Sequence, residues 1–486
     1  MNLRQQAAAG VFWSAAGNWG YQIATLVVFA VLSRVLRPEE FGVVALASVF
    51  TALLKLIAEQ GLADALVQRA EVTAEHFDTA FWVSLGLGTL LAAILASTSW
   101  LIADFVNEPE VGPVLTWLSL TLVFSGLSSV QRAILTREMR FASLTARTLS
   151  SDVVGGVVGV VAALLGFGVW SLVAQLITIE AVGTVALWTA STWRPRLRFS
   201  RNHIGELISF GANVVGFKLL RFFNTRIDNL MVGSILGATA LGFYVVAYRL
   251  LELLINVTTA IIGAVAFPVL SRIQHDRDKV QKAYYKSIRL TSAIAFPAFL
   301  GLIVVAPEVT RLLFGNQWDP SVPVMRVLAF AGLLYSIIFV NGIVMKSLGK
   351  PSWRLSIMAI TAVALVGAFW VAVQQGIVAV AMALAIVSFV LAPLWLYGAH
   401  KLITLEPRRY IRQIGPPLVS SLGMMAAVSG VKLLIDDVGL VWQVVFLVTT
   451  GVLTYFGLLW LVGRPLVREA LELGRLAIPR RTAGAQ

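Results

Sequence analysis

The sequence contains no cysteine and only four histidines in 486 residues. The lack of cysteine excludes disulfides, thiolate metal sites and cysteine nucleophiles. Charged residues are also scarce, at 13%, where a soluble domain carries ~25%. A chain in which 58% of the residues are hydrophobic cannot cover itself with a water-soluble surface from so few charges. These absences indicate an all-α polytopic membrane protein.

Long apolar runs are abundant. A membrane helix needs ~20 largely apolar residues to cross ~30 Å of hydrocarbon. Fourteen runs meet this requirement, and they cover approximately residues 10–33, 41–60, 80–103, 113–131, 148–166, 168–191, 204–224, 240–266, 289–313, 322–345, 355–375, 376–399, 415–434 and 441–462. The sequence therefore predicts fourteen transmembrane helices. They divide into an N-terminal lobe at 1–200, a C-terminal lobe at 201–400, two further helices within 401–463 and a cytoplasmic tail at 464–486.

The formal net charge of +13 is informative once it is divided among the loops. With the N-terminus in the cytoplasm, most Lys and Arg residues, Arg147 among them, fall in loops on the inner side. The basic residues at outward helix ends are few: Arg34, Arg37, Arg226, Arg311 and Lys432. Basic loops remain in the cytoplasm during insertion, so this asymmetry predicts that both termini are cytoplasmic.

The chain partly resembles itself at an offset of about 200 residues. The segment Leu36–Gly42 resembles Leu236–Gly242, and the spacing of Phe105 and Asn107 is repeated by Phe314 and Asn316. A repeat of six helices has the same orientation in both copies, because six is even. Two parallel six-helix repeats around a central cleft are a transporter architecture, and the last two helices lie outside it. The alternative is chance similarity between helices rich in Gly and Ala.

Five basic residues lie within predicted spans: Lys55, Lys218, Arg221, Arg249 and Arg326. A charge at the centre of a membrane helix costs ~2.5–3.5 kcal/mol, so such residues usually face a cavity or a partner. Alternatives remain open, because Arg326 is near a helix end, Arg249 has Glu252 one turn away, and Lys55 could extend inward past Glu59. Lys218 and Arg221 share one helix face, where two like charges repel unless an anion or an acid joins them.

Polar side chains also recur along the predicted helices at 10–33 and 240–266. The residues in these stripes that we consider candidates for substrate contact are Asn18, Gln22, Tyr244, Tyr248 and Asn256. Stripes on corresponding helices of both repeats predict a hydrated, cationic cleft. The acids Glu180, Asp228 and Glu252 are candidates for ion coupling, and for Glu180 a protonated structural carboxyl group is the alternative.

Catalytic motifs are missing from the sequence. It has no phosphate-binding glycine-rich loop and no histidine pair at metal-ligand spacing. We therefore expect no cofactor, no metal and no enzyme activity. Transport energy would come from an ion gradient, the membrane potential, or the supply and removal of substrate.

Several segments together resemble the polysaccharide transporter family. They include Leu32–Gly42, Gln60–Gln68, Gly166–Val173, Asp228-Asn229, Ala247-Tyr-Arg249, Phe267–Arg272 and Gly315–Trp318. Within that family the chain is most similar to Wzx-type flippases of the colanic acid exporter branch, which belong to the superfamily of MATE exporters and the lipid II flippase. The match runs from about residue 5 to residue 400.

The resemblance implies two six-helix lobes that alternate between inward and outward openings in a bacterial inner membrane. It implies a substrate in which an oligosaccharide repeat unit is joined by pyrophosphate to undecaprenol. Lys55, Lys218, Arg221 and Arg249 would then hold the pyrophosphate. The partners would be this lipid-linked substrate, membrane lipid and, further, a polymerase and other polysaccharide assembly proteins, but no nucleic acid. The rival hypotheses are a MATE-like exporter of small molecules, a membrane glycosyltransferase or polymerase, and a scaffold of an assembly complex.

Overall fold

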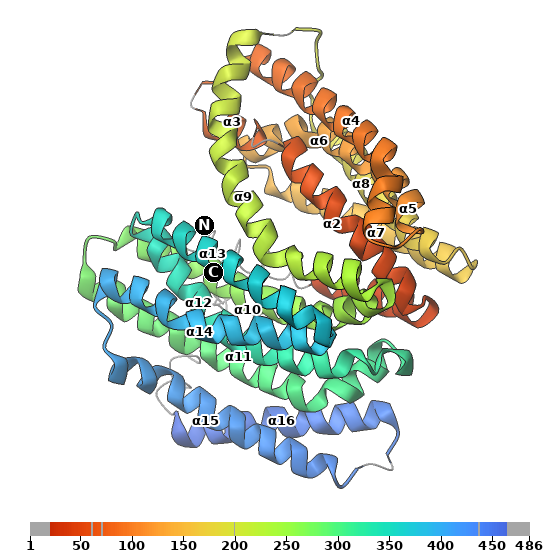
Figure 1. Ribbon diagram of the computed structural model, residues 1–486. Coiled ribbons are helices and arrows are strands. Elements are labelled where there is room, and N and C mark those ends of the chain that lie inside the picture. Colours follow the sequence, from red (N-terminus) through yellow and green to blue (C-terminus); the bar gives the residue numbers. More distant parts are fainter. Residues whose placement is uncertain (1–19, 60–61, 70, 199, 436–437, 464–486) are drawn as a thin grey trace, which may run out of the picture. The chain divides into compact units, whose positions relative to one another are not determined.

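The computed structural model describes residues 20–59, 62–69, 71–198, 200–435 and 438–463 (Figure 1). These residues form helices joined by short connections, and they contain no strand. Twelve of the helical segments are long and apolar enough to cross a membrane. The prediction of an all-α polytopic membrane protein is therefore confirmed.

The chain divides into two compact units. The first unit contains Ile23–Val246 and Met358–Val380. Its elements are most of a first helix at Gly20–Val35, α2 (Pro38–Glu59), α3 (Leu62–Gln68), α4 (Ala74–Phe105), α5 (Val111–Leu118), α6 (Leu120–Arg137), α7 (Phe141–Leu164), α8 (Val169–Ala190), α9 (Arg201–Leu236), the start of α10 (Ala238–Arg272), most of α13 (Pro351–Ala372), the 3-10 turn η2 (Val373–Gln375) and the start of α14 (Ile377–Ile403).

The second unit contains residues 20–22, Ala247–Ile357 and the described residues from Ala381 onward. Its elements are the remainder of α10, α11 (Arg277–Leu313), the 3-10 turn η1 (Asn316–Trp318), α12 (Ser321–Ser347), the start of α13, most of α14 (Ile377–Ile403), α15 (Pro407–Lys432) and α16 (Leu440–Val462). The predicted lobe boundaries stay predictions.

The predicted helix at 204–224 is too short. In the structure α9 continues without a break from Arg201 to Leu236, so Arg226 lies inside a helix and not at its outward end. The sequence suggests an end near residue 224 because Arg226, Asp228 and Asn229 interrupt the apolar run. Asp228 and Asn229 are nevertheless buried, at 4% and 7% exposed. The Asp228 carboxylate is satisfied within the fold, because it accepts hydrogen bonds from the Asn229 N–H and from the Tyr244 hydroxyl.

The count of fourteen spans stays a prediction, as do the sides of the membrane assigned to the termini. Each of the twelve observed spans corresponds to one predicted run. The two remaining runs correspond to the helix at Gly20–Val35, which is shorter, and to α9, which carries several charges.

The two segments that resemble each other in sequence also contact each other within the first unit. Pro38 begins α2 and Ala238 begins α10. A Cβ atom on Gly42 would overlap the carbonyl oxygen of Ala238, and one on Gly242 would overlap the carbonyl oxygen of Pro38. Only glycine allows this reciprocal approach of two backbones, so both glycines are required where these helix ends cross.

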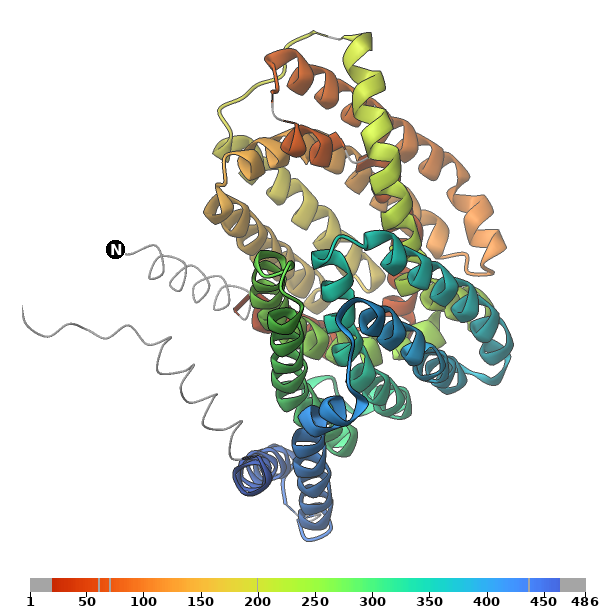
Figure 2. The same cartoon turned by 90° about the vertical axis from the view of Figure 1, so that its left-hand side faces the viewer.

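In the second unit, α15 and α16 form a hairpin that packs along α11 (Figures 1 and 2). Near one end, the Tyr285 hydroxyl accepts a hydrogen bond of 2.8 Å from the Glu406 N–H. Further along, the Tyr455 hydroxyl donates to the Ala293 carbonyl at 2.7 Å. Near the other end, Lys432 forms an ion pair of 2.7 Å with Glu308. Two hydrogen bonds and one ion pair thus join the hairpin to α11 at three positions along its length.

Candidate functional site

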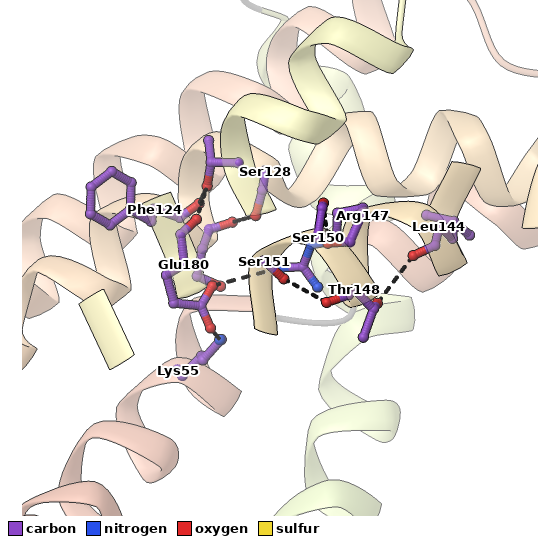
Figure 3. Close-up of polar contacts among 11 residues, drawn as sticks. Lys55, Phe124, Ser128, Leu144, Arg147, Thr148, Ser150, Ser151 and Glu180 are labelled. Atoms are coloured by element: carbon purple, nitrogen blue, oxygen red, sulfur yellow. Dashed lines mark hydrogen bonds and ion pairs between the residues drawn. The ribbon is translucent and has the colours of Figure 1, made fainter. Parts of the chain in front are cut away.

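Three charged side chains from three helices meet inside the first unit (Figure 3). Glu180 lies midway along α8, and its Oε1 atom is 2.5 Å from Nζ of Lys55 on α2. Its other oxygen, Oε2, lies 3.8 Å from Nη2 of Arg147 on α7. The side chains are 28% exposed for Lys55, 17% for Glu180 and 18% for Arg147. One carboxylate is therefore shared by two cations that remain partly accessible.

Glycines allow the helices to hold this arrangement. A Cβ atom on Gly183, three residues after Glu180 on α8, would lie 2.7 Å from Nε and Nη2 of Arg147. The guanidinium group therefore lies directly over the backbone of α8 at this glycine. On α7, Gly155 and Gly159 face Gln175 of α8, and a Cβ atom on Gly159 would be 2.9 Å from the Cβ atom of Gln175. Small residues let membrane helices approach closely, which brings Arg147 within reach of Glu180.

A second acid completes the cluster. Asp152 on α7 interacts electrostatically with both Arg147 and Glu180. Among the described residues, no ion pair joins Asp152 to a basic side chain. We call Lys55, Arg147, Asp152 and Glu180 the shared cluster. The net charge of the cluster is zero when all four groups are ionised. An anion can therefore bind the two cations only if it displaces a carboxylate or if a carboxylate is neutralised first.

The structure brings together residues that the sequence assigned to different tasks. Lys55 was predicted to bind substrate and Glu180 to couple an ion, yet they form one pair. Arg147 was missed, because the predicted helix began at residue 148 and left it in an inner loop. In the structure α7 begins at Phe141, so Arg147 lies in its second turn. The apolar residues Phe141, Leu144 and Leu149 recur at helical spacing and would have suggested an earlier start.

The other three cations that the sequence predicts as substrate contacts lie in two different units. Lys218 is half-buried and Arg221 is exposed, both on α9 in the first unit. Arg249 is half-buried on the part of α10 that belongs to the second unit. A common anion site for these three cations stays a prediction.

The polar stripe on α10 is divided between buried and accessible positions. Tyr244 is fully buried, and its hydroxyl donates to Oδ2 of Asp228 at 3.1 Å. This contact links α10 to α9 within the first unit, so in this conformation neither group faces an open space. Tyr248 and Glu252 are half-buried, and Asn256 is exposed. Roles in substrate contact or ion coupling stay predictions for all five residues.

Two predicted residues belong to the first helix. Gln22 is half-buried near the start of the helix at Gly20–Val35. Asn18 lies outside the described residues. No group of three or more His, Asp or Glu side chains in the described ranges is arranged to hold a metal ion.

Comparison with known proteins assigns the family. Residues 31–323 match the family described as polysaccharide biosynthesis protein. The chain belongs to this family. It is 30% identical over 339 residues to lipopolysaccharide biosynthesis protein WzxC of Escherichia coli (strain K12), and the match covers 69% of each chain. It is 28% identical over 476 residues to succinoglycan biosynthesis transport protein ExoT of Rhizobium meliloti (strain 1021), with 97% of this chain and 96% of that protein covered.

Solved structures support the same fold. The lipid II flippase MurJ in an inward closed conformation superposes with a TM-score of 0.77 at 15% identity, and 93% of this chain and 99% of that chain are covered. An inward-facing MATE family multidrug resistance transporter of the MOP superfamily gives 0.65 at 18% identity, over 78% and 94% of the two chains. The resemblance to the polysaccharide transporter family is therefore confirmed. The expectation of a multi-pass transporter in a bacterial inner membrane agrees with these bacterial relatives and with the twelve spans.

Proposed function

We propose that the protein is a flippase that moves oligosaccharide repeat units linked by pyrophosphate to undecaprenol from the inner to the outer leaflet by alternating access. Its family and the transport proteins it resembles support a role in polysaccharide export. The observation that carries the proposal is the shared cluster, where Lys55 and Arg147 both contact Glu180 inside the membrane-spanning part of the chain. Two cations on one carboxylate are suited to exchange that carboxylate for a phosphate oxygen.

In this mechanism the carboxylates and the substrate compete for the same cations. When Glu180 becomes neutral, by taking up a proton or a coupling ion, Lys55 and Arg147 are released to bind the pyrophosphate. When the substrate leaves, Glu180 ionises and recovers both cations, which avoids an uncompensated charge in the membrane. The cycle links ion binding to substrate binding, and ion release to substrate release, without any soluble ATPase domain.

The remaining candidate residues extend this proposal. Lys218, Arg221 and Arg249 would hold the pyrophosphate at other stages of the cycle. Side chains with hydrogen-bonding or aromatic groups would contact the sugars: Asn18, Gln22, Tyr244, Tyr248 and Asn256. Asp228 and Glu252 would be further sites of ion coupling. A polymerase and other assembly proteins would receive the exported unit.

The test uses purified protein in liposomes that contain a fluorescent pyrophosphate-linked glycolipid. Replacing Lys55 and Arg147 together by glutamine removes both cations and keeps polar side chains of moderate length. We expect transport to fall about a hundredfold, which corresponds to the loss of about 2–3 kcal/mol of binding. The control is Lys432→Gln, which removes a lysine that is likewise 28% exposed and paired with a glutamate, in the second unit.

The outcomes separate the proposal from its rivals. Normal transport by the double variant, with the protein folded and inserted, would exclude the shared cluster as the substrate site. Transport of cationic dyes and not of the glycolipid would indicate a MATE-like exporter. No transport of either compound, with normal assembly of the polysaccharide machinery in cells, would indicate a scaffold.

A further inference from the structure

The connection between α8 and α9 displays an apolar side chain between two basic ones. Leu197 is 90% exposed, and the flanking residues Arg196 and Arg198 are exposed as well. The Arg198 N–H donates to the Arg196 carbonyl at 2.8 Å, which closes a tight turn with Leu197 at its apex. In the described part of the chain, no acidic side chain forms an ion pair with Arg196 or Arg198. We call these three residues the basic tip.

The basic tip is fixed to the start of α4 and does not project as a free loop. The Arg196 N–H donates to Oδ1 of Asp78 at 3.0 Å, and Nε1 of Trp82 donates to the Arg196 carbonyl at 2.9 Å. The Ser200 N–H donates to the Thr79 hydroxyl at 3.2 Å. The fold thus uses three hydrogen bonds to hold an exposed leucine in one place. A rigidly presented leucine is unfavourable in water but favourable in contact with lipid.

The depth of the basic tip follows from α4 and the aromatic residues around it. At 1.5 Å per residue, the 32 residues of α4 extend over about 48 Å, whereas the hydrocarbon core is ~30 Å thick. The polar first turns of α4 therefore project beyond the core, and its apolar run begins near Ala80. Beside this point Trp82, Trp188 and Trp193 surround Phe81, with ring centroids 5.3–6.0 Å from it. Tryptophans gather at the membrane–water boundary, so the basic tip lies at the level of the lipid headgroups.

We propose that the basic tip binds anionic phospholipid of the adjacent leaflet. Arg196 and Arg198 bind the phosphate groups, and Leu197 inserts among the upper parts of the acyl chains. Paired arginines suit the planar geometry of phosphate oxygens, and juxtamembrane basic residues are attracted to anionic lipid. The neighbouring Arg194 is already engaged, because its Nη1 donates to the carbonyls of Ser191 and Trp193 and its guanidinium lies 5.6 Å from the Trp188 ring centroid. The proposal does not depend on the transported substrate.

The absence of cysteine makes a direct test possible. Leu197→Cys places a single thiol at the apex, which is labelled with an environment-sensitive fluorophore in the full chain. The protein is reconstituted in vesicles of phosphatidylcholine alone or of phosphatidylcholine mixed with phosphatidylglycerol. The control is Gln274→Cys, an exposed position in the connection between α10 and α11, which the sequence places on the same side of the membrane.

We expect the label at position 197 to emit at shorter wavelength in vesicles than in detergent. Spin-labelled lipid should quench it, and aqueous iodide should quench it several-fold less than the label at position 274. The protection should increase when phosphatidylglycerol is present, and adding Arg196→Gln and Arg198→Gln should remove that increase. As a second measurement without a label, Leu197→Ser should lower the thermal midpoint in phosphatidylglycerol vesicles, whereas Leu197→Ile should not.

Three results would overturn the proposal. Equal iodide quenching at positions 197 and 274 would show that the tip lies in water. Protection that is independent of phosphatidylglycerol and of both arginines would show that anionic lipid is not recognised. Protection that appears only after addition of the pyrophosphate-linked glycolipid would assign the tip to the substrate.

Discussion

Two clusters of identical composition occur in the two units, and they are arranged differently. The shared cluster in the first unit contains Lys55, Arg147, Asp152 and Glu180. The second unit contains Lys432, Arg311, Asp319 and Glu308, which we call the paired cluster. Each has one lysine, one arginine, one aspartate and one glutamate.

In the paired cluster each cation has its own acid. Lys432 contacts Glu308 at 2.7 Å, and Arg311 donates to both oxygens of Asp319, with its closest contact at 2.9 Å. Lys432 also donates to the Val304 carbonyl at 3.3 Å. These bonds fasten α15 to α11 and α11 to the turn at Asp319. One-to-one ion pairs of this kind stabilise one arrangement, because within the described ranges neither acid forms an ion pair with a second cation for which it could exchange its partner.

In the shared cluster Glu180 serves two cations at unequal distances, 2.5 Å and 3.8 Å. The longer contact is too long for a hydrogen bond. Among the described residues, neither Oε2 of Glu180 nor Oε2 of Glu308 accepts a hydrogen bond, but only in Glu180 does a second cation, Arg147, form an ion pair with this oxygen. Such a carboxylate can exchange one cation for another at a small cost in free energy. A structural site is thus distinguished from a candidate transport site by the way its charges are distributed among partners, more than by their number.

The strongest test of the comparison replaces each glutamate by glutamine. In Glu180→Gln, Lys55 and Arg147 lose their competing anion, so we expect the pyrophosphate-linked substrate to bind about tenfold more tightly and turnover to fall at least about tenfold. In Glu308→Gln, we expect turnover per folded molecule to remain within about twofold. That variant should instead lose about 1–3 kcal/mol of stability, because Lys432 is left without its acid.

The measurements are the glycolipid transport rate in liposomes, substrate binding to the purified protein and thermal unfolding in detergent. Loss of turnover in Glu308→Gln with unchanged unfolding would remove the distinction between the two clusters. So would a Glu180→Gln variant that differs from the unaltered protein only in stability.

The next test exchanges the charges within each lysine–glutamate pair. In Lys432→Glu combined with Glu308→Lys, the ion pair is restored with opposite polarity, and we expect recovery of about 1 kcal/mol relative to either single variant. In Lys55→Glu combined with Glu180→Lys, the new lysine faces Arg147, so we expect no recovery of transport. Thermal unfolding and the transport assay measure these results, and recovery of transport by the second exchange would contradict a shared carboxylate.

Most of the fold could be predicted from the sequence, because membrane spans are defined by the length and polarity of single runs. The runs at 41–60 and 441–462, for example, correspond to α2 and α16 to within a few residues. Prediction failed where a helix carries charges that other helices satisfy. The helix α9 passes through Arg226 and Asp228 to Leu236, and the hydroxyl group that meets Asp228 belongs to Tyr244 on α10.

The candidate site could be predicted only one residue at a time. Lys55 and Glu180 are unusual because each is a charge within an apolar run, which a single sequence reveals. Their pairing depends on how α2 packs against α8, over a separation of 125 residues, and no local pattern specifies it. Arg147 was missed for a different reason, since a basic residue near a helix end looks the same in sequence whether it faces the cytoplasm or a neighbouring helix.

The mildest test uses one glycine in each unit: Gly183, beside Arg147 of the shared cluster, and Gly301, about two turns before Glu308 on α11. A Cβ atom on Gly183 would lie 2.7 Å from the Arg147 guanidinium, which is the mobile end of a long side chain, whereas one on Gly301 would lie 3.6 Å from Cε of Met424. We expect Gly301→Ala to be neutral or stabilising by up to about 1 kcal/mol, because alanine favours helix and the space is available. Gly183→Ala gains the same helix propensity but must move Arg147 away from α8.

The expected signature of Gly183→Ala is therefore a change in transport of about threefold with stability within about 1 kcal/mol of the unaltered protein. The matched Gly301→Ala variant should leave transport unchanged. If both alanines leave transport unchanged, the position of Arg147 over Gly183 is unimportant for the cycle. A shift confined to Gly183→Ala would show that the second, longer contact of Glu180 contributes to transport, because the added Cβ atom meets the Arg147 guanidinium at Gly183 and only the end of Met424 at Gly301.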